Sequence, residues 1–145
     1  MEANKPVRLS VYILKIIWTA LLLSQIVYLI LAFLLYGEPL FIVPEELNSF
    51  SKAFLILSLS FIVMGFILFN LLLKPVKKSV SYKDAKQKYF IPFVVRLALI
   101  EAFSLLGFAY SSMLKQNLMM SFTFVAILSF LFCFPTESKI KKEMR

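Results

Sequence analysis

Residues 91–110, IPFVVRLALIEAFSLLGFAY, are the most informative part of this chain. Only Arg96, Glu101 and Ser104 interrupt the apolar character of the stretch, and Pro92 falls in its first turn, where a helix tolerates proline. Twenty helical residues rise about 30 Å, which matches the hydrocarbon core of a bilayer. The stretch therefore predicts a membrane-spanning helix that carries one basic and one acidic residue.

Three further apolar blocks of similar length lie elsewhere in the chain. The blocks lack the two-residue alternation of membrane β-strands and are about twice as long. Of the 145 residues, 61% are apolar, whereas soluble domains have about 45–50%, which excludes a soluble enzyme. The sequence therefore predicts one all-α polytopic membrane domain over 1–145, with four transmembrane helices at about 16–36, 53–73, 91–110 and 118–134. The second helix is expected to stop at Lys74-Pro75.

An internal similarity bears on how the helices are arranged. Residues 67–75 and 127–135 agree at four of nine positions, at an offset of 60. Two helical hairpins related by duplication would produce such a match, and parallel repeats of this kind build some membrane folds. Chance agreement between apolar sequences would produce it equally well, so both interpretations stay open.

The charges predict the orientation of the chain. The formal net charge is +8, and thirteen basic residues lie on one side of the predicted bundle against two on the other. The positive-inside rule then predicts an inner (cell) membrane protein with both termini and the basic loop 74–90 in the cytoplasm, and no nucleic-acid partner. Six loop lysines are expected to contact anionic lipids of the bilayer, an acidic protein partner being the alternative: Lys74, Lys77, Lys78, Lys83, Lys86 and Lys88.

The composition limits the chemistry of the chain. There is no histidine, a single cysteine and only three glycines, none of them close together. The usual general base, a cysteine metal cluster and a phosphate-binding glycine loop are therefore missing. We expect a non-enzymatic protein without a metal or another cofactor.

Glu101 is the leading candidate for a functional residue. It lies near the middle of its predicted helix, where a carboxylate costs about 2.5–3.5 kcal/mol on insertion scales. A protonatable carboxyl at this depth suits ion or proton transfer, and it also suits hydrogen bonding between helices. Gln25 lies at a similar depth on the first helix and is within reasonable reach of Glu101. Ser104 shares the helix face of Glu101 and is a third candidate for this hydrogen-bonded group.

Arg96 precedes Glu101 by five residues, which places the two side chains about 140° apart around the helix. They are therefore not expected to pair. We interpret Arg96 as snorkelling to the inner interface, with a counter-charge to an acid on a partner chain as the functional alternative.

Small residues recur at helical spacing on two of the predicted helices. Such stripes allow helix backbones to approach closely, either within the chain or between subunits. The candidates for helix packing are Ala98, Ala102, Gly107, Ser58 and Gly65.

Residues 97–107 resemble the second helix of the proteolipid (c-ring) subunits of rotary ATP synthases. The family pattern Leu-Ala-x-x-Glu-Ala, with a glycine five residues later, is matched by Leu97, Ala98, Glu101, Ala102 and Gly107. The resemblance implies that Glu101 is the ion-carrying carboxylate. Two extra helices, and a second helix without the family's regular glycines, depart from the pattern.

Two functional hypotheses follow from these features. The first is a small non-enzymatic membrane subunit that assembles with itself, as a homo-oligomer, or with other membrane subunits in a larger complex. The alternative is an ion- or proton-translocating, proteolipid-like subunit that uses Glu101.

Overall fold

The computed structural model describes residues 11–36, 49–78, 85, 87–114 and 119–144. The prediction of an all-α protein is confirmed for this part of the chain, which contains no strand. A helix satisfies its own backbone hydrogen bonds, which an unbroken apolar segment requires in lipid. The helices are α1 (Val11–Tyr36), α2 (Ser49–Lys77), α4 (Phe90–Leu114), α5 (Met119–Phe132) and α6 (Glu137–Glu143).

Three of the described helices are long and apolar enough to cross a membrane, over Val11–Leu35, Lys52–Lys77 and Phe90–Ser112. The number rises to four if α5 and α6 form one span with an 85° bend. The sequence predicted four transmembrane helices, the fourth over about 118–134. Helix α5 differs because it has only 14 residues, and its rise of about 21 Å is shorter than the hydrocarbon core.

The helix boundaries also differ from the predicted ones. Helix α1 begins at Val11, a turn before the apolar block, and α2 begins at Ser49 and ends at Lys77. The expected stop at Pro75 is wrong, because this proline lies inside the last turn of α2. Proline removes one intrahelical hydrogen bond there, and the helix ends two residues later.

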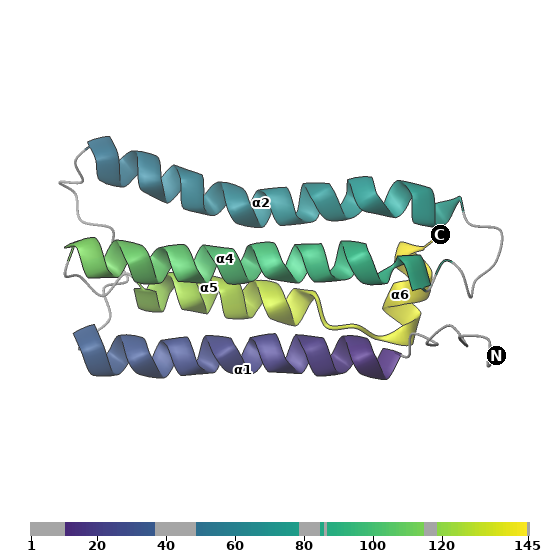
Figure 1. Cartoon of the computed structure of the whole chain (residues 1–145), viewed down its shortest axis with the longest axis horizontal. Coiled ribbons are helices and arrows are strands. Elements are labelled where there is room, and N and C mark those ends of the chain that lie inside the picture. Colours follow the sequence, from purple (N-terminus) through teal and green to yellow (C-terminus); the bar gives the residue numbers. More distant parts are fainter. Residues whose placement is uncertain (1–10, 37–48, 79–84, 86, 115–118, 145) are drawn as a thin grey trace, which may run out of the picture.

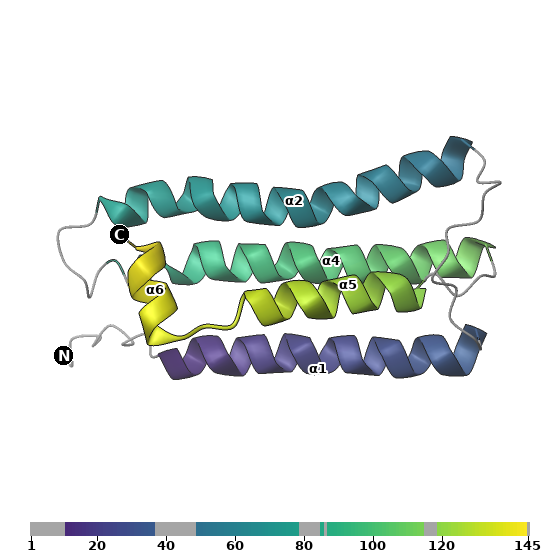
Figure 2. The ribbon, with the colours of Figure 1, turned by 180° about the vertical axis from the view of Figure 1, so that it is seen from behind.

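Helix α6 lies across one end of the bundle (Figure 1). The sharp turn before it contains Pro135, and Thr136 then caps the new helix by accepting a hydrogen bond from the Lys139 N–H at 3.2 Å. Ile140 faces the bundle and is completely buried. Helix α1 begins at the same end of the bundle, so the described chain starts and finishes on one side (Figure 2).

Helix α4 is the centre of the bundle and packs against α2, α5 and α1. Helix α1 also packs on α5, where the Trp18 indole N–H donates to the Phe130 carbonyl at 2.8 Å. Of the two hairpins considered, the one formed by α4 and α5 is present. The first and second helices do not form the other, because α4 lies between them (Figures 1 and 2).

Two glycines of the predicted packing stripes lie at helix contacts. A Cβ atom on Gly65 of α2 would lie 3.4 Å from the Arg96 carbonyl oxygen of α4. A Cβ atom on Gly107 of α4 would lie only 2.4 Å from the Phe122 Cβ atom of α5. The α4–α5 contact therefore depends on the missing side chain at Gly107.

Candidate functional site: an intramembrane carboxyl beside an open groove

Glu101 lies at the midpoint of the candidate span Phe90–Ser112 and reaches from α4 toward α1. Its Oε1 atom accepts a hydrogen bond from the Ser24 hydroxyl at 2.8 Å, and its Oε2 atom accepts one from the Gln25 amide. The Gln25 amide oxygen in turn accepts a hydrogen bond from the Ser104 hydroxyl. These four residues, here called the polar cluster, join α1 to α4 in the middle of the bundle.

The polar cluster contains residues that the sequence analysis named and one that it did not. The three predicted residues Gln25, Glu101 and Ser104 lie together in this cluster, and both Gln25 and Ser104 are completely buried. Ser24 was missed, and so was Tyr28, which faces Glu101 and interacts with it. The spacing within this apolar helix could have indicated both missed residues. Ser24 and Tyr28 are four residues apart and therefore share a helix face, and Gln25 lies next to Ser24 in the sequence.

The Ser24 hydroxyl has two oxygen neighbours but only one proton. Its Oγ atom lies 2.7 Å from the Leu21 carbonyl oxygen and 2.8 Å from Glu101 Oε1. A carbonyl only accepts hydrogen bonds. When Ser24 donates to Leu21, its contact with Glu101 is a hydrogen bond only if the carboxyl is protonated and donates to Ser24. When Ser24 donates to Glu101, the contact suits the ionised carboxylate.

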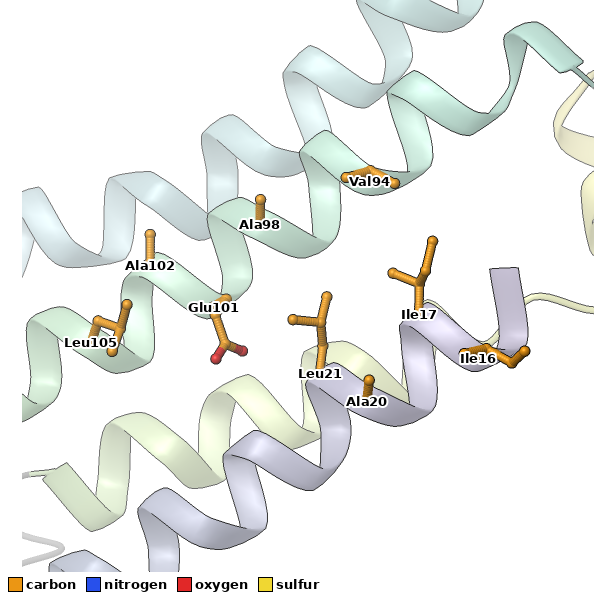
Figure 3. Close-up of a pocket in the computed structure, with 9 residues that line it drawn as sticks. All are labelled: Ile16, Ile17, Ala20, Leu21, Val94, Ala98, Glu101, Ala102 and Leu105. Carbon is orange, nitrogen blue, oxygen red and sulfur yellow. The ribbon is translucent and has the colours of Figure 1, made fainter. Parts of the chain in front are cut away.

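An open groove with a volume of about 490 Å³ borders the polar cluster between α1 and α4 (Figure 3). Four side chains of α1 and five of α4 line it, and Glu101 is the single polar residue among them. Ile16 and Leu105 in its wall are 49% and 48% exposed, so the groove opens on the outer surface of the bundle. At this depth that surface would face lipid.

The predicted packing residues divide between helix contacts and the groove. Ser58 is completely buried and donates a hydrogen bond to the Phe54 carbonyl of its own helix at 2.8 Å. Ala98 and Ala102 instead line the groove, and Ala98 is exposed. Their small side chains therefore leave space beside Glu101 within this chain, and a role for them between subunits stays a prediction.

Arg96 lies apart from the polar cluster and is buried, with a side chain that is 4% exposed. Its Nη1 atom lies 3.6 Å from the Glu143 carboxylate of α6, and its guanidinium carbon lies 3.7 Å from the centre of the Phe69 ring. The snorkelling interpretation is therefore wrong, because α6 covers the position through which the side chain would reach water. The counter-charge is an acid of the same chain.

Tyr89 completes this second group, which joins α4 to α6. Its hydroxyl donates to the other Glu143 carboxylate oxygen. Burial, followed by the hydrogen bond and the charge of Glu143, raises the pKa of Tyr89 above its usual value. Tyr89 therefore stays a hydrogen-bond donor over the ordinary pH range. Nothing in the sequence indicated that Glu143 joins Arg96 and Tyr89, because Glu143 lies on a separate helix far along the chain from the other two.

The predicted lipid-contacting lysines are only partly described. Lys74, Lys77 and Lys78 are exposed at the end of α2, and Lys88 is exposed before α4. Lys83 and Lys86 lie outside the described residues. Among the described residues, no group of three or more histidine, cysteine, aspartate or glutamate side chains could hold a metal ion.

Comparisons with protein-family models, curated proteins and solved structures find no match to this chain. The class of the protein therefore rests on its own fold and site. It is a helical protein with three, or up to four, helices able to span a membrane, and with one carboxyl group at mid-span beside an open apolar groove.

Proposed function

We propose that this chain is a small, non-enzymatic, multi-pass membrane protein that translocates protons, with Glu101 as the residue that takes up and releases each proton. The shared hydroxyl of Ser24 is the observation that supports this function most directly. It provides a partner for the neutral carboxyl in one orientation and for the carboxylate in the other. A rotation of this hydroxyl therefore accompanies the change in protonation of Glu101, while the Gln25 and Ser104 hydrogen bonds persist.

The proposed orientation is that of an inner-membrane protein with both termini in the cytoplasm. The beginning of α1, the end of α2 and all of α6 lie at one end of the bundle, and this end carries many lysines. The positive-inside rule assigns such an end to the cytoplasm, where the lysines meet anionic lipids. Glu101 then lies about halfway between the two aqueous compartments.

Proton uptake is tested with the full-length chain in vesicles that contain a pH-sensitive dye. An imposed membrane potential is expected to drive proton entry with the wild type, and Glu101→Gln is expected to reduce it to the rate of empty vesicles. Glu137→Gln is the matched control, because Glu137 is an exposed acid on α6, and it should conduct like the wild type. Undiminished proton entry with Glu101→Gln would exclude this function.

A second candidate function is assembly, with the polar cluster serving as a hydrogen-bonded tie between α1 and α4. The complete burial of Gln25 and Ser104 favours it, since buried polar groups must be paired in lipid. In this case the chain is a subunit of a homo-oligomer or of a larger membrane complex, and the exposed Ala98 lies at a helix contact between subunits.

The same substitutions separate the two functions. Glutamine reproduces the neutral acid, because its amide can donate to Ser24 while its carbonyl accepts from Gln25. Assembly should therefore survive Glu101→Gln and fail with Glu101→Ala, as measured by native mass spectrometry after gentle detergent extraction. A wild-type chain that is a monomer in every detergent would exclude the assembly function.

A further inference from the structure

The groove beside Glu101 has the dimensions of a small-molecule site. Its volume of about 490 Å³ lies within the range of roughly 300–1,000 Å³ that is usual for such sites. Its walls are apolar apart from Glu101. It is open at Ile16 and Leu105, on the surface that would face the lipid chains, so an apolar molecule dissolved in the bilayer could enter it directly.

The charge of the groove selects among apolar molecules. In its ionised form Glu101 brings one negative charge to the groove, and the groove lining contains no basic side chain to balance it. Such a charge in apolar surroundings interacts strongly with an opposite charge, because the effective dielectric constant is low. A neutral lipid chain would occupy the same walls without using the carboxylate, and an organic anion would be repelled by it.

We infer that this groove binds an organic cation with an apolar body, with Glu101 as its counter-ion and the side chains of α1 and α4 around the body. This inference rests on the proposed proton exchange at Glu101. The cation contacts the carboxylate as the carboxyl proton leaves for the solvent, so one positive charge replaces another. The Ser24 hydroxyl turns from the Leu21 carbonyl to the carboxylate oxygen.

Tyr28 is the titratable side chain of α1 that faces Glu101. A phenol loses its proton far less readily than a carboxyl group does. The proton that a bound cation displaces therefore comes from Glu101.

Binding is tested with a pair of probes that have the same shape and opposite charge, tetraphenylphosphonium and tetraphenylborate. The full-length chain is placed in phosphatidylcholine nanodiscs, and binding is followed by calorimetry. Tetraphenylphosphonium is expected to bind with the release of about one proton per cation in weakly buffered solution, and more tightly as the pH rises. Glu101→Gln should weaken this binding by at least about tenfold.

A second variant tests the groove without changing the carboxyl. Ala98→Phe fills the groove and is expected to abolish binding of the cation. Ala109→Phe is the matched control, because Ala109 is an exposed alanine of the same helix that does not line the groove, and it should bind like the wild type. Equal binding of the two probes, or equal binding by Ala98→Phe and Ala109→Phe, would overturn the inference.

The outcomes also separate this inference from the proposed function. Proton entry that depends on Glu101, together with no tetraphenylphosphonium binding, overturns the inference and leaves proton exchange standing. Binding that depends on Glu101 but releases no proton contradicts proton exchange, and it also overturns the exchange of cation for proton inferred here.

Discussion

The Arg96 Nη1 atom lies 3.6 Å from the Glu143 Oε1 atom, so an ion pair joins the central helix α4 to the C-terminal helix α6. Tyr89 donates to the second oxygen of the same carboxylate. The Arg96 Nε and Nη2 atoms are buried without a hydrogen-bond partner among the described residues. Glu143 therefore supplies the counter-charge for a guanidinium that is otherwise enclosed by aromatic rings.

Glu143→Gln is expected to release α6 from the end of the bundle. The glutamine still accepts a hydrogen bond from Tyr89 but leaves the Arg96 charge unpaired, and breaking a buried pair in this way costs about 3 kcal/mol. Cys133 reports the change, because it is the sole cysteine and is 1% exposed in the turn before α6. Its maleimide labelling should become at least about tenfold faster.

Two further variants control this experiment. Glu137→Gln makes the same chemical change at an exposed position of α6 and should label like the wild type. Arg96→Gln combined with Glu143→Gln removes both charges, and its labelling should return toward the wild-type rate. If the double variant labels as fast as Glu143→Gln alone, the unpaired guanidinium is not the cause.

The attachment of α6 is also expected to weaken at alkaline pH. The pKa of Tyr89 in the folded protein is raised above its ordinary value of 10.0, mainly by burial. Its contribution to stability is therefore complete below about pH 10 and is lost as the pH rises toward the folded-state pKa, because the unfolded chain loses this proton first. Thermal unfolding measured across the alkaline range should show this decline, and Tyr89→Phe should reduce its slope. An unchanged slope would exclude Tyr89 as the source.

Gly107→Ala is expected to destabilise the contact between α4 and α5. The new Cβ atom would lie 2.4 Å from the Phe122 Cβ atom, so the helices must move apart, at a cost of about 1–3 kcal/mol. Gly65→Ala is the matched control, because its nearest neighbours lie 3.4 Å away, and it should unfold close to the wild-type temperature. Unfolding in detergent can be followed through the fluorescence of Trp18, the sole tryptophan. Equal effects of the two substitutions would contradict the packing at Gly107.

Gln25→Leu is expected to lower the stability of the bundle by about 2 kcal/mol, since it leaves buried partners without their hydrogen bonds. Ser104 loses its acceptor and Glu101 loses a donor. Asn70→Leu is the matched control, because Asn70 is an exposed polar residue of α2. The same tryptophan fluorescence measures both variants. A Gln25→Leu protein as stable as Asn70→Leu would show that the polar cluster does not hold α1 against α4.

The helices were predictable because a transmembrane helix is a local property of sequence. Its length, apolar composition and self-contained hydrogen bonds can be read within one segment of about twenty residues. The same local reasoning failed at Pro75, which α2 includes, and at α5, which is shorter than its apolar block. Helix ends depend on neighbouring segments, such as the turn that leads into α6, as well as on the residues themselves.

Glu101 could be recognised from the sequence as a candidate residue, because the free-energy cost of a carboxylate in lipid depends on its own charge and depth. Its partners depended on the packing of helices far apart in the chain. Ser24 and Glu101 are 77 positions apart, and the ion pair of Arg96 requires α6 to fold back over the end of α4. The groove likewise has walls from both α1 and α4, a geometry that no single helix contains. Composition and hydropathy thus specify which segments are able to cross a membrane, whereas side-chain pairing and open space arise only when the helices meet.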